Sequence, residues 1–216
     1  MKEGFSLAET LITLGVIGIV AALTIPGLIT KYQQTQTVIG LKKTYSVLQQ
    51  AVRMASDEYG DCEGWEYTLP YKDFVNRYFT PYIKLSEVNI EYTYTDLQYT
   101  THTIRDVFIL PAGEIFYYMR NVYMQNKNFI LVDINGTSKP NRMGRDVFVF
   151  SFYENILTSY TQYTSFNLKS FKNPGNGGTS GQCNRNAQGG TFGPGSYCST
   201  VIMANNWQIP VGYPWK

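Results

Sequence analysis

The longest apolar stretch of the chain lies near its N-terminus. From Thr10 to Thr30 there is no charged side chain, and the core of this stretch has the sequence LITLGVIGIVAALTIPGLI. As a helix that rises about 1.5 Å per residue, it reaches roughly 30 Å, the thickness of a bilayer hydrocarbon core. The sequence therefore predicts a transmembrane helix over residues 10–30.

A secretory signal peptide and a plain membrane anchor can both contain an apolar run. A signal peptide has a basic N-terminal region, about 7–15 apolar residues and a small-x-small cleavage site. Here the negative charge of Glu3 cancels the positive charge of Lys2, and the apolar run is longer than that of a signal peptide. Ala21-Ala22-Leu23 also lacks the small-x-small spacing of a cleavage site. A plain anchor leaves Glu9 unexplained, because an unpaired acid in lipid costs on the order of a few kcal/mol.

Helical periodicity continues after the apolar run. Apolar positions recur at spacings of three and four residues, with polar side chains between them, and Gly60 ends the pattern. We expect one helix over residues 5–59, with this stripe packed on a sheet of the same subunit. The stripe consists of Val38, Leu41, Tyr45, Leu48, Val52, Ala55 and Tyr59.

A second helix and then a series of strands are predicted for the remaining chain. Aromatic residues from Tyr71 to Tyr82 recur at helical spacing until Pro81 interferes, so this helix is expected to cover the sheet. Alternating and β-branched runs then predict strands, and short connections favour an antiparallel meander. The predicted strands are 88–94, 104–110, 114–119, 128–134 and 146–152.

Two connections contain turn sequences. Leu110-Pro111-Ala112-Gly113-Glu114 predicts a tight hairpin, and Ile134-Asn135-Gly136 predicts a type I′ turn. The fold class is therefore α+β, with a long N-terminal helix packed on a small antiparallel sheet. The globular head is expected over residues 60–216, with a Gly- and Asn-rich surface loop at 167–199.

Composition narrows the classes of function. Charged residues make up 16 % of the 216 residues, the formal net charge is +2, and the basic residues are scattered, so nucleic-acid binding is not indicated. His102 is the single histidine and is expected to be a solvated strand-edge or loop residue. No arrangement of residues predicts an active site, so we do not expect an enzyme.

The residues Gly4-Phe5-Ser6-Leu7-Ala8-Glu9-Thr10-Leu11, followed by the apolar run, resemble the N-terminus of type IV prepilins and type II secretion pseudopilins. In that family a membrane aspartate peptidase cuts after the glycine, and the new amino group is N-methylated. The resemblance implies a leader peptide at residues 1–4, cleavage between Gly4 and Phe5, and methylation of Phe5. The leader departs from the pattern in being short and carrying little positive charge.

The resemblance also implies an assembly role for Glu9, which becomes the fifth residue of the mature chain. The free amine of Phe5 and the carboxylate of Glu9 are opposite charges that neighbouring subunits can pair inside an apolar helix bundle. In related filaments the helix unwinds between the positions of Gly18 and Pro26. A tolerated kink in a continuous helix is the alternative for this chain.

The segment from Val132 to Phe148 resembles a loop of some pseudopilin-like proteins, as do the closing residues Trp207 to Trp215. Some pseudopilins bind calcium, for which Asp133, Asn135 and Asp146 could supply oxygen ligands. Against calcium, the spacing is not that of an EF-hand, and Asp, Asn and Gly are ordinary turn residues.

Three cysteines, Cys62, Cys183 and Cys198, become interpretable once a compartment is assumed. If the head lies in an oxidising compartment, Cys183 and Cys198 could close the Gly-rich loop with a disulfide. One alternative is a disulfide between Cys62 and either Cys183 or Cys198, and another is that all three cysteines are reduced.

The resemblance implies a structural subunit of a type II secretion pseudopilus or type IV pilus-like filament. It would sit in the bacterial inner membrane with its head outside the cytoplasm and later in the filament. Its expected partners are identical or related pilin subunits, the prepilin peptidase and methyltransferase, and an inner-membrane assembly platform. The alternative is a membrane-tethered binding or adhesion protein that does not polymerise, with recognition sought in the loop 173–198.

Overall fold

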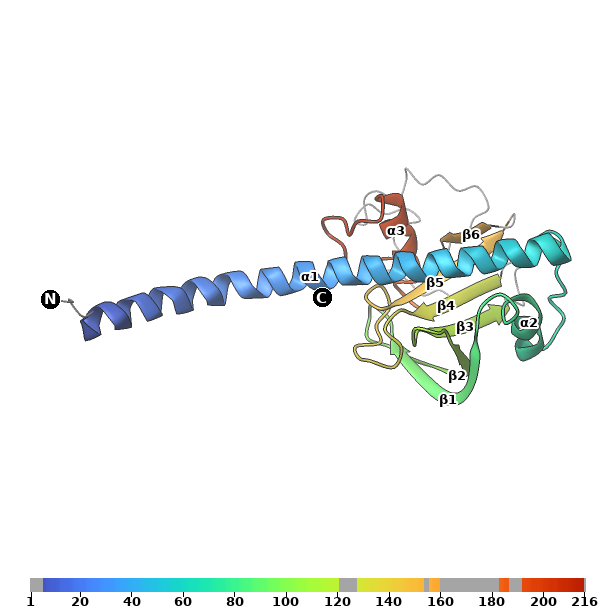
Figure 1. The fold of residues 1–216 in the computed structure, drawn as a ribbon, viewed down its shortest axis with the longest axis horizontal. Helices are drawn as coiled ribbons and strands as arrows, with labels where there is room; N and C mark the ends of the chain where they lie inside the picture. The colour runs from blue at the N-terminus through green and yellow to red at the C-terminus, as the bar shows by residue number, and fades with distance from the viewer. Residues whose placement is uncertain (1–5, 121–127, 154–155, 160–182, 187–191, 216) are drawn as a thin grey trace. The chain divides into compact units, whose positions relative to one another are not determined.

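A computed structural model describes residues 6–120, 128–153, 156–159, 183–186 and 192–215 (Figure 1). It divides into two compact units, residues 1–36 and 37–216. The elements are α1 (Leu7–Tyr59), a 3₁₀ turn (Cys62–Gly64), α2 (Tyr71–Tyr78), β1 (Ser86–Thr95), β2 (Thr101–Ile109), β3 (Ile115–Arg120), β4 (Asn128–Asp133), β5 (Val147–Tyr153), β6 (Ile156–Ser159) and α3 (Cys198–Ala204).

The six strands form one antiparallel sheet in the order of the chain, β1-β2-β3-β4-β5-β6. This confirms the predicted α+β class and the meander. The strand β6 and the helix α3 were not predicted, because β6 is only four residues long and α3 follows a Gly-rich stretch.

The two predicted turns have different outcomes. The hairpin between β2 and β3 is confirmed, with Gly113 N–H donating to Leu110 C=O at 2.9 Å. The type I′ turn at Ile134-Asn135-Gly136 is wrong: a type I′ turn needs positive φ at both central residues, but only Gly136 has it. The connection from β4 to β5 instead runs from Ile134 to Asp146, and Ile134 N–H bonds the carbonyl of Asp146 at 2.9 Å.

The second unit, residues 37–216, is called the head unit below. Within it, residues 37–59 of α1 pack on the sheet (Figure 1). Leu41, Leu48, Val52 and Ala55 of the predicted stripe are fully buried. The helix ends at Tyr59, and Gly60 has φ +81°, a conformation that glycine adopts at low cost, as predicted.

The helix α2 covers part of the sheet, as its periodicity predicted. Phe74, Val75 and Tyr78 are buried, and the ring of Phe74 stacks on Tyr118 of β3 with 4.2 Å between centroids. Trp65 in turn stacks on Tyr78 at 4.4 Å. The abundant aromatic residues therefore form much of the core around this helix.

The strand β1 is one edge of the sheet, and charged pairs line it. Glu87 bonds Lys72 of α2, and Glu91 accepts hydrogen bonds from Arg105 of β2 at 3.0 and 3.2 Å. The register between β1 and β2 shifts between Val88 and Glu91. Charged side chains and an irregular register are common on exposed edges.

A buried glutamine connects α1 to the opposite edge of the sheet. The Oε1 atom of Gln49 accepts a hydrogen bond from the main-chain N–H of Leu157 in β6 at 2.8 Å, and from the hydroxyl of Tyr45 at 3.4 Å. Gln49 and Leu157 are both buried, so water cannot readily replace this acceptor. The helix thus supplies an acceptor to the backbone of β6.

We expect Gln49→Ala to lower the free energy of unfolding by about 1–3 kcal/mol, because the Leu157 N–H would be left buried without its acceptor. Urea denaturation of the full chain in detergent, followed by tryptophan fluorescence, measures this loss. The neighbouring Gln50 is exposed, so Gln50→Ala is the matched control and should change stability by less than about 0.5 kcal/mol. Equal effects of the two variants would contradict the role of Gln49.

Candidate functional site

The N-terminus of α1 is closed by a reciprocal pair of hydrogen bonds between Ser6 and Glu9. Ser6 N–H donates to Glu9 Oε2 at 2.9 Å, and Glu9 N–H donates to Ser6 Oγ at 3.3 Å. This is a capping box, which satisfies main-chain donors that a helix start leaves unpaired. Glu9 therefore lies at the first turn of α1; Gly4 and Phe5 lie outside the described residues.

The helix that follows exposes its apolar side chains on all sides. In the described residues α1 is the one helix long and apolar enough to cross a membrane, and its apolar window has no buried residue. Glu9 is the only charged residue between Ser6 and Thr30. The exposed large side chains of this region are Leu7, Leu11, Ile12, Leu14, Val16, Ile17, Ile19, Val20, Leu23, Ile25, Leu28 and Ile29.

The polar groups of this helix are satisfied internally. The hydroxyls of Thr13, Thr24 and Thr30 each donate to the carbonyl four residues earlier, at 2.9–3.0 Å. The helix is continuous through Gly18 and Pro26, although proline lacks a donor. Thr30 bonds the Pro26 carbonyl, so the residues beyond the proline stay in helical register. Unwinding between Gly18 and Pro26 in a filament stays a prediction.

Asp133, Asn135 and Asp146 come together between β4 and β5. Asp133 Oδ1 accepts from Asn135 N–H at 3.0 Å, and its Oδ2 accepts from the Tyr92 hydroxyl. Asp146 Oδ2 accepts from Asn141 N–H at 3.0 Å and from Asn135 Nδ2 at 3.4 Å, while Oδ1 accepts from Arg142 N–H. Protein donors therefore meet all four carboxylate oxygens.

A calcium ion would require these hydrogen bonds to rearrange. In the part of the chain that the structure describes, no three His, Cys, Asp or Glu residues are grouped as metal ligands. In the present arrangement each carboxylate oxygen already accepts a hydrogen bond from the protein. Calcium binding near these residues stays a prediction.

The two carboxyl groups are perturbed by their surroundings. Burial, reinforced by the negative charge of Asp146, raises the pKa of Asp133 to about 7. Burial also raises the pKa of Asp146, although the main-chain N–H groups of Arg142 and Asn141 oppose this shift. Asp133 thus holds a proton at pH values where a solvated aspartate is ionised.

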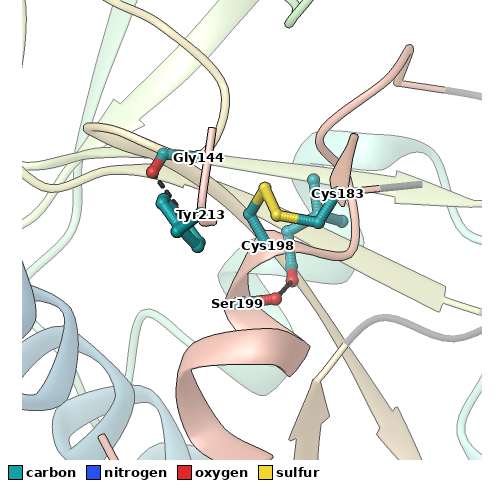
Figure 2. Close-up of a disulfide and its surroundings, with 6 residues drawn as sticks. Gly144, Cys183, Cys198, Ser199 and Tyr213 are labelled. Atoms are coloured by element: carbon teal, nitrogen blue, oxygen red, sulfur yellow. Dashed lines mark hydrogen bonds between the residues drawn. A yellow bond between two sulfur atoms is a disulfide. The ribbon is translucent and has the colours of Figure 1, made fainter. Parts of the chain in front are cut away.

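Cys183 and Cys198 form a disulfide, with Cα atoms 4.8 Å apart (Figure 2). The bond joins the segment 183–186 to the start of α3, whose Ser199 hydroxyl donates to the Val149 carbonyl of β5 at 2.6 Å. Gly144 lies against Cys198: a Cβ on this glycine would lie 2.8 Å from the Cys198 sulfur. Cys62 is buried and is not in a disulfide.

The predicted surface loop at 167–199 is partly wrong. Phe192 to Ser199 are buried, and Phe192 packs edge-on against Phe129 of β4 with 5.7 Å between ring centroids. Gly193 has φ +82°, and a Cβ there would lie 2.6 Å from the Asp96 carboxylate. Much of the remaining loop, residues 167–182 and 187–191, lies outside the described residues.

His102 is less solvated than expected, because its side chain is 27 % exposed. Its Nε2 atom lies 3.0 Å from Oδ2 of Asp96, which is buried, and its ring stacks on Tyr94 with 5.0 Å between centroids. The other oxygen of Asp96 accepts from the main-chain N–H groups of Gln98 and Thr100 at 2.8 and 3.0 Å. His102 therefore stabilises the turn between β1 and β2.

The detected similarity to other proteins covers the head unit and not the N-terminal motif. A family model matches residues 27–216, which is most of the chain. The chain belongs to DUF6613, a family of unknown function. The match to DUF6613 begins inside α1, beyond Gly4, Phe5 and Glu9.

No curated protein and no solved structure matches the DUF6613 chain significantly. The prepilin resemblance thus depends on the N-terminal residues and on the loop sequences quoted above.

Two buried residues of the loops, Asp96 and Arg142, were not singled out by sequence. Asp96 gives no recognisable signal, because its partner is a histidine six residues away across a turn. Arg142 is buried, although arginine is usually exposed. The residues around it, Pro140 to Gly144, have the composition of an ordinary surface turn. Neither residue could be found without the fold.

We expect Asp133→Asn to change how stability depends on pH. Between the unfolded pKa of 3.8 and the folded value of about 7, the native state binds more protons, so rising pH lowers wild-type stability in this window. Asparagine cannot titrate, so the variant should gain stability relative to wild type from pH 4.5 to pH 8. Urea midpoints of the full chain in detergent, measured at both pH values, test this.

The exposed acid Asp57 provides the control, since Asp57→Asn should follow the wild-type pH profile. A constant stability difference between Asp133→Asn and wild type across the range would show that Asp133 does not hold the extra proton.

Proposed function

We propose that this DUF6613 protein is the structural subunit of a type II secretion pseudopilus or type IV pilus-like filament. In this proposal the chain is cleaved after Gly4, N-methylated on Phe5 and assembled through α1. The observation that carries it is the exposed apolar helix with Glu9 as its single charge. Before assembly the helix anchors the chain in the inner membrane, and the head lies outside the cytoplasm.

The apolar helix needs surroundings that water cannot provide. Burying one Leu, Ile or Val side chain contributes about 1.5–3 kcal/mol, and a dozen such residues are exposed between Leu7 and Ile29. Lipid can bury them in the single subunit, and the same helices of neighbouring subunits can bury them in a filament. The threonine hydroxyls do not oppose this burial, because they are bonded within the helix.

Glu9 distinguishes a filament subunit from a plain anchor. An ionised carboxylate at the edge of lipid is unfavourable unless an opposite charge lies near it. In the described structure only Oε2 of Glu9 takes part in the capping box, through Ser6 N–H. Cleavage would create a positive amine on Phe5, one residue before Ser6, and a neighbouring subunit could bring this amine to Glu9.

The head fits an oxidising compartment. The Cys183–Cys198 disulfide closes a loop across a sequence separation of 15 residues. Disulfides persist mainly outside the cytoplasm, which agrees with a head translocated across the inner membrane. The partners in this proposal are other pilin subunits, the prepilin peptidase and methyltransferase, and the inner-membrane assembly platform.

A membrane-tethered binding protein is the alternative function. It would use the same apolar helix as an anchor, but it would need neither the cleavage at Gly4 nor the charge of Glu9. The two functions therefore differ in processing and in polymerisation.

Processing is expected to produce a mature chain that begins at Phe5 and carries one added methyl group. Intact-mass and peptide mass spectrometry of the protein from its native membrane measure both changes. Replacing Gly4 with Val should block cleavage because a branched side chain would occupy the position next to the cut bond. Gly15→Ala, in open space on α1, is the control and should be processed normally. A chain that keeps Met1 would contradict the proposal.

Assembly is expected to require the charge of Glu9. Glu9→Gln keeps the size and the helix cap but removes the negative charge, so we expect at least a tenfold loss of filaments, with cleavage retained. Electron microscopy and immunoblots of sheared filaments, in cells that contain the assembly machinery, measure the loss. Asp57→Asn, which removes an exposed helical acid far along α1, should assemble normally. Wild-type filament yield from Glu9→Gln would favour the tethered binding protein.

A further inference from the structure

Three loops meet beside the N-terminal end of β2. They are the β1–β2 turn, residues 141–145 of the β4–β5 connection, and residues 192–197. Main-chain hydrogen bonds hold them together: Thr95 N–H to Asn141 C=O at 2.9 Å, Met143 N–H to Thr95 C=O at 2.8 Å, and Leu97 N–H to Pro194 C=O at 3.0 Å. This contact region is therefore built from segments far apart in the sequence.

Arg142 lies in this region with an unpaired guanidinium edge. The residue is only 8 % exposed, and its Nε and Nη2 atoms are buried without a hydrogen-bond partner. These two nitrogens form the side of guanidinium that can bind both oxygens of one carboxylate. A buried cation without an acceptor is costly, so this edge requires a ligand or ordered water.

A second cation and an exposed aromatic ring lie beside Arg142. The guanidinium carbon of Arg142 is 4.2 Å from the ring centroid of Tyr99, and that of Arg185 is 5.9 Å from the same centroid. The Gln98 side chain donates to the Arg185 carbonyl at 2.9 Å, which ties this segment to the turn. Two guanidinium groups, those of Arg142 and Arg185, therefore make cation–π contacts with the ring of Tyr99.

Neither nearby carboxylate neutralises these arginines. Asp146 bonds the main-chain N–H of Arg142 rather than its guanidinium, and Asp96 bonds His102 and the turn N–H groups. Among the described residues, no ion pair includes Arg142 or Arg185. The site has an excess of positive charge and unused donors.

We propose that Arg142, Arg185 and Tyr99 form a binding site for a carboxylate group. The Nε–Nη2 edge of Arg142 binds both carboxylate oxygens, and Arg185 adds a second positive charge at the rim. Tyr99 is 60 % exposed, and its ring centroid lies 4.2 Å from the Arg142 guanidinium carbon at the rim of the site. The proposal is independent of polymerisation, because it rests only on residues of the head unit.

The carboxylate could belong to a small acid or to the end of a peptide chain. Full-length protein in detergent, labelled with ¹⁵N-arginine, is titrated at constant ionic strength while the Nε–Hε resonance of Arg142 is followed. The probes are sodium acetate, triglycine with a free carboxylate, triglycine amide and inorganic phosphate. We expect saturable shifts with acetate or free triglycine and none with the amide. Triglycine binding without acetate binding would identify the end of a peptide chain as the source.

Three variants test the residues. Arg142→Lys keeps the charge but loses the two-nitrogen edge, and should weaken carboxylate binding at least tenfold. Arg185→Gln and Tyr99→Ala change residues nearer the surface and keep the test available if Arg142→Lys does not fold. Arg185→Gln should weaken binding several-fold. Arg105→Gln, on the exposed face of β2, is the matched control and should bind as wild type does.

Three outcomes would overturn the proposal. They are saturation by phosphate without saturation by acetate or triglycine, equal shifts with triglycine and its amide, and no saturable shift with any probe. The last outcome would assign the Arg142 edge to buried water. Unchanged carboxylate affinity in Arg185→Gln would remove Arg185 from the site.

Discussion

The exposure of one apolar helix is the constraint on which the rest of this chain depends. The apolar side chains of residues 7–29 are exposed, and the threonines there bond within the helix, so the helix is compatible with lipid or with other apolar helices. In the proposed filament, the carboxylate at the first turn would make those surroundings selective, because lipid alone does not neutralise Glu9. The hydrophobic core of the head unit contains none of these side chains.

The head achieves this by using the second half of α1 as a core element. Leu41, Leu48 and Val52 fill the core, while Gln49 gives an acceptor to β6. At the β2–β3 turn, Lys43 of the same helix pairs with the buried Glu114 at 3.3 Å. One continuous helix thus changes along its length, from an apolar stretch that ends at Thr30 to an amphipathic stretch within the head unit, which begins at Thr37.

Periodicity predicted much of this architecture, since Leu41, Leu48 and Phe74 show the helical spacing that burial requires. The meander followed from short connections, of which Leu110 to Glu114 was correct. The failures lie where tertiary contacts override local preference. Asn135-Gly136 suggests a tight turn, but the connection is longer. The carboxylates of Asp133 and Asp146 stabilise it by accepting hydrogen bonds from its main-chain N–H groups. His102 is polar and near a turn, yet Asp96 and the segment at Gly193 cover part of its ring.

The charged border of β1 has a consequence for crowding. Heads held side by side at high local concentration would present their open sheet edges to one another, and bare edges invite intermolecular strand pairing. Two ion pairs, Glu87 with Lys72 and Glu91 with Arg105, place charges along the β1 edge. The register shift between Val88 and Glu91 also interrupts the regular hydrogen-bond pattern of β1. In the proposed filament, these features would disfavour strand pairing between the β1 edges of neighbouring heads.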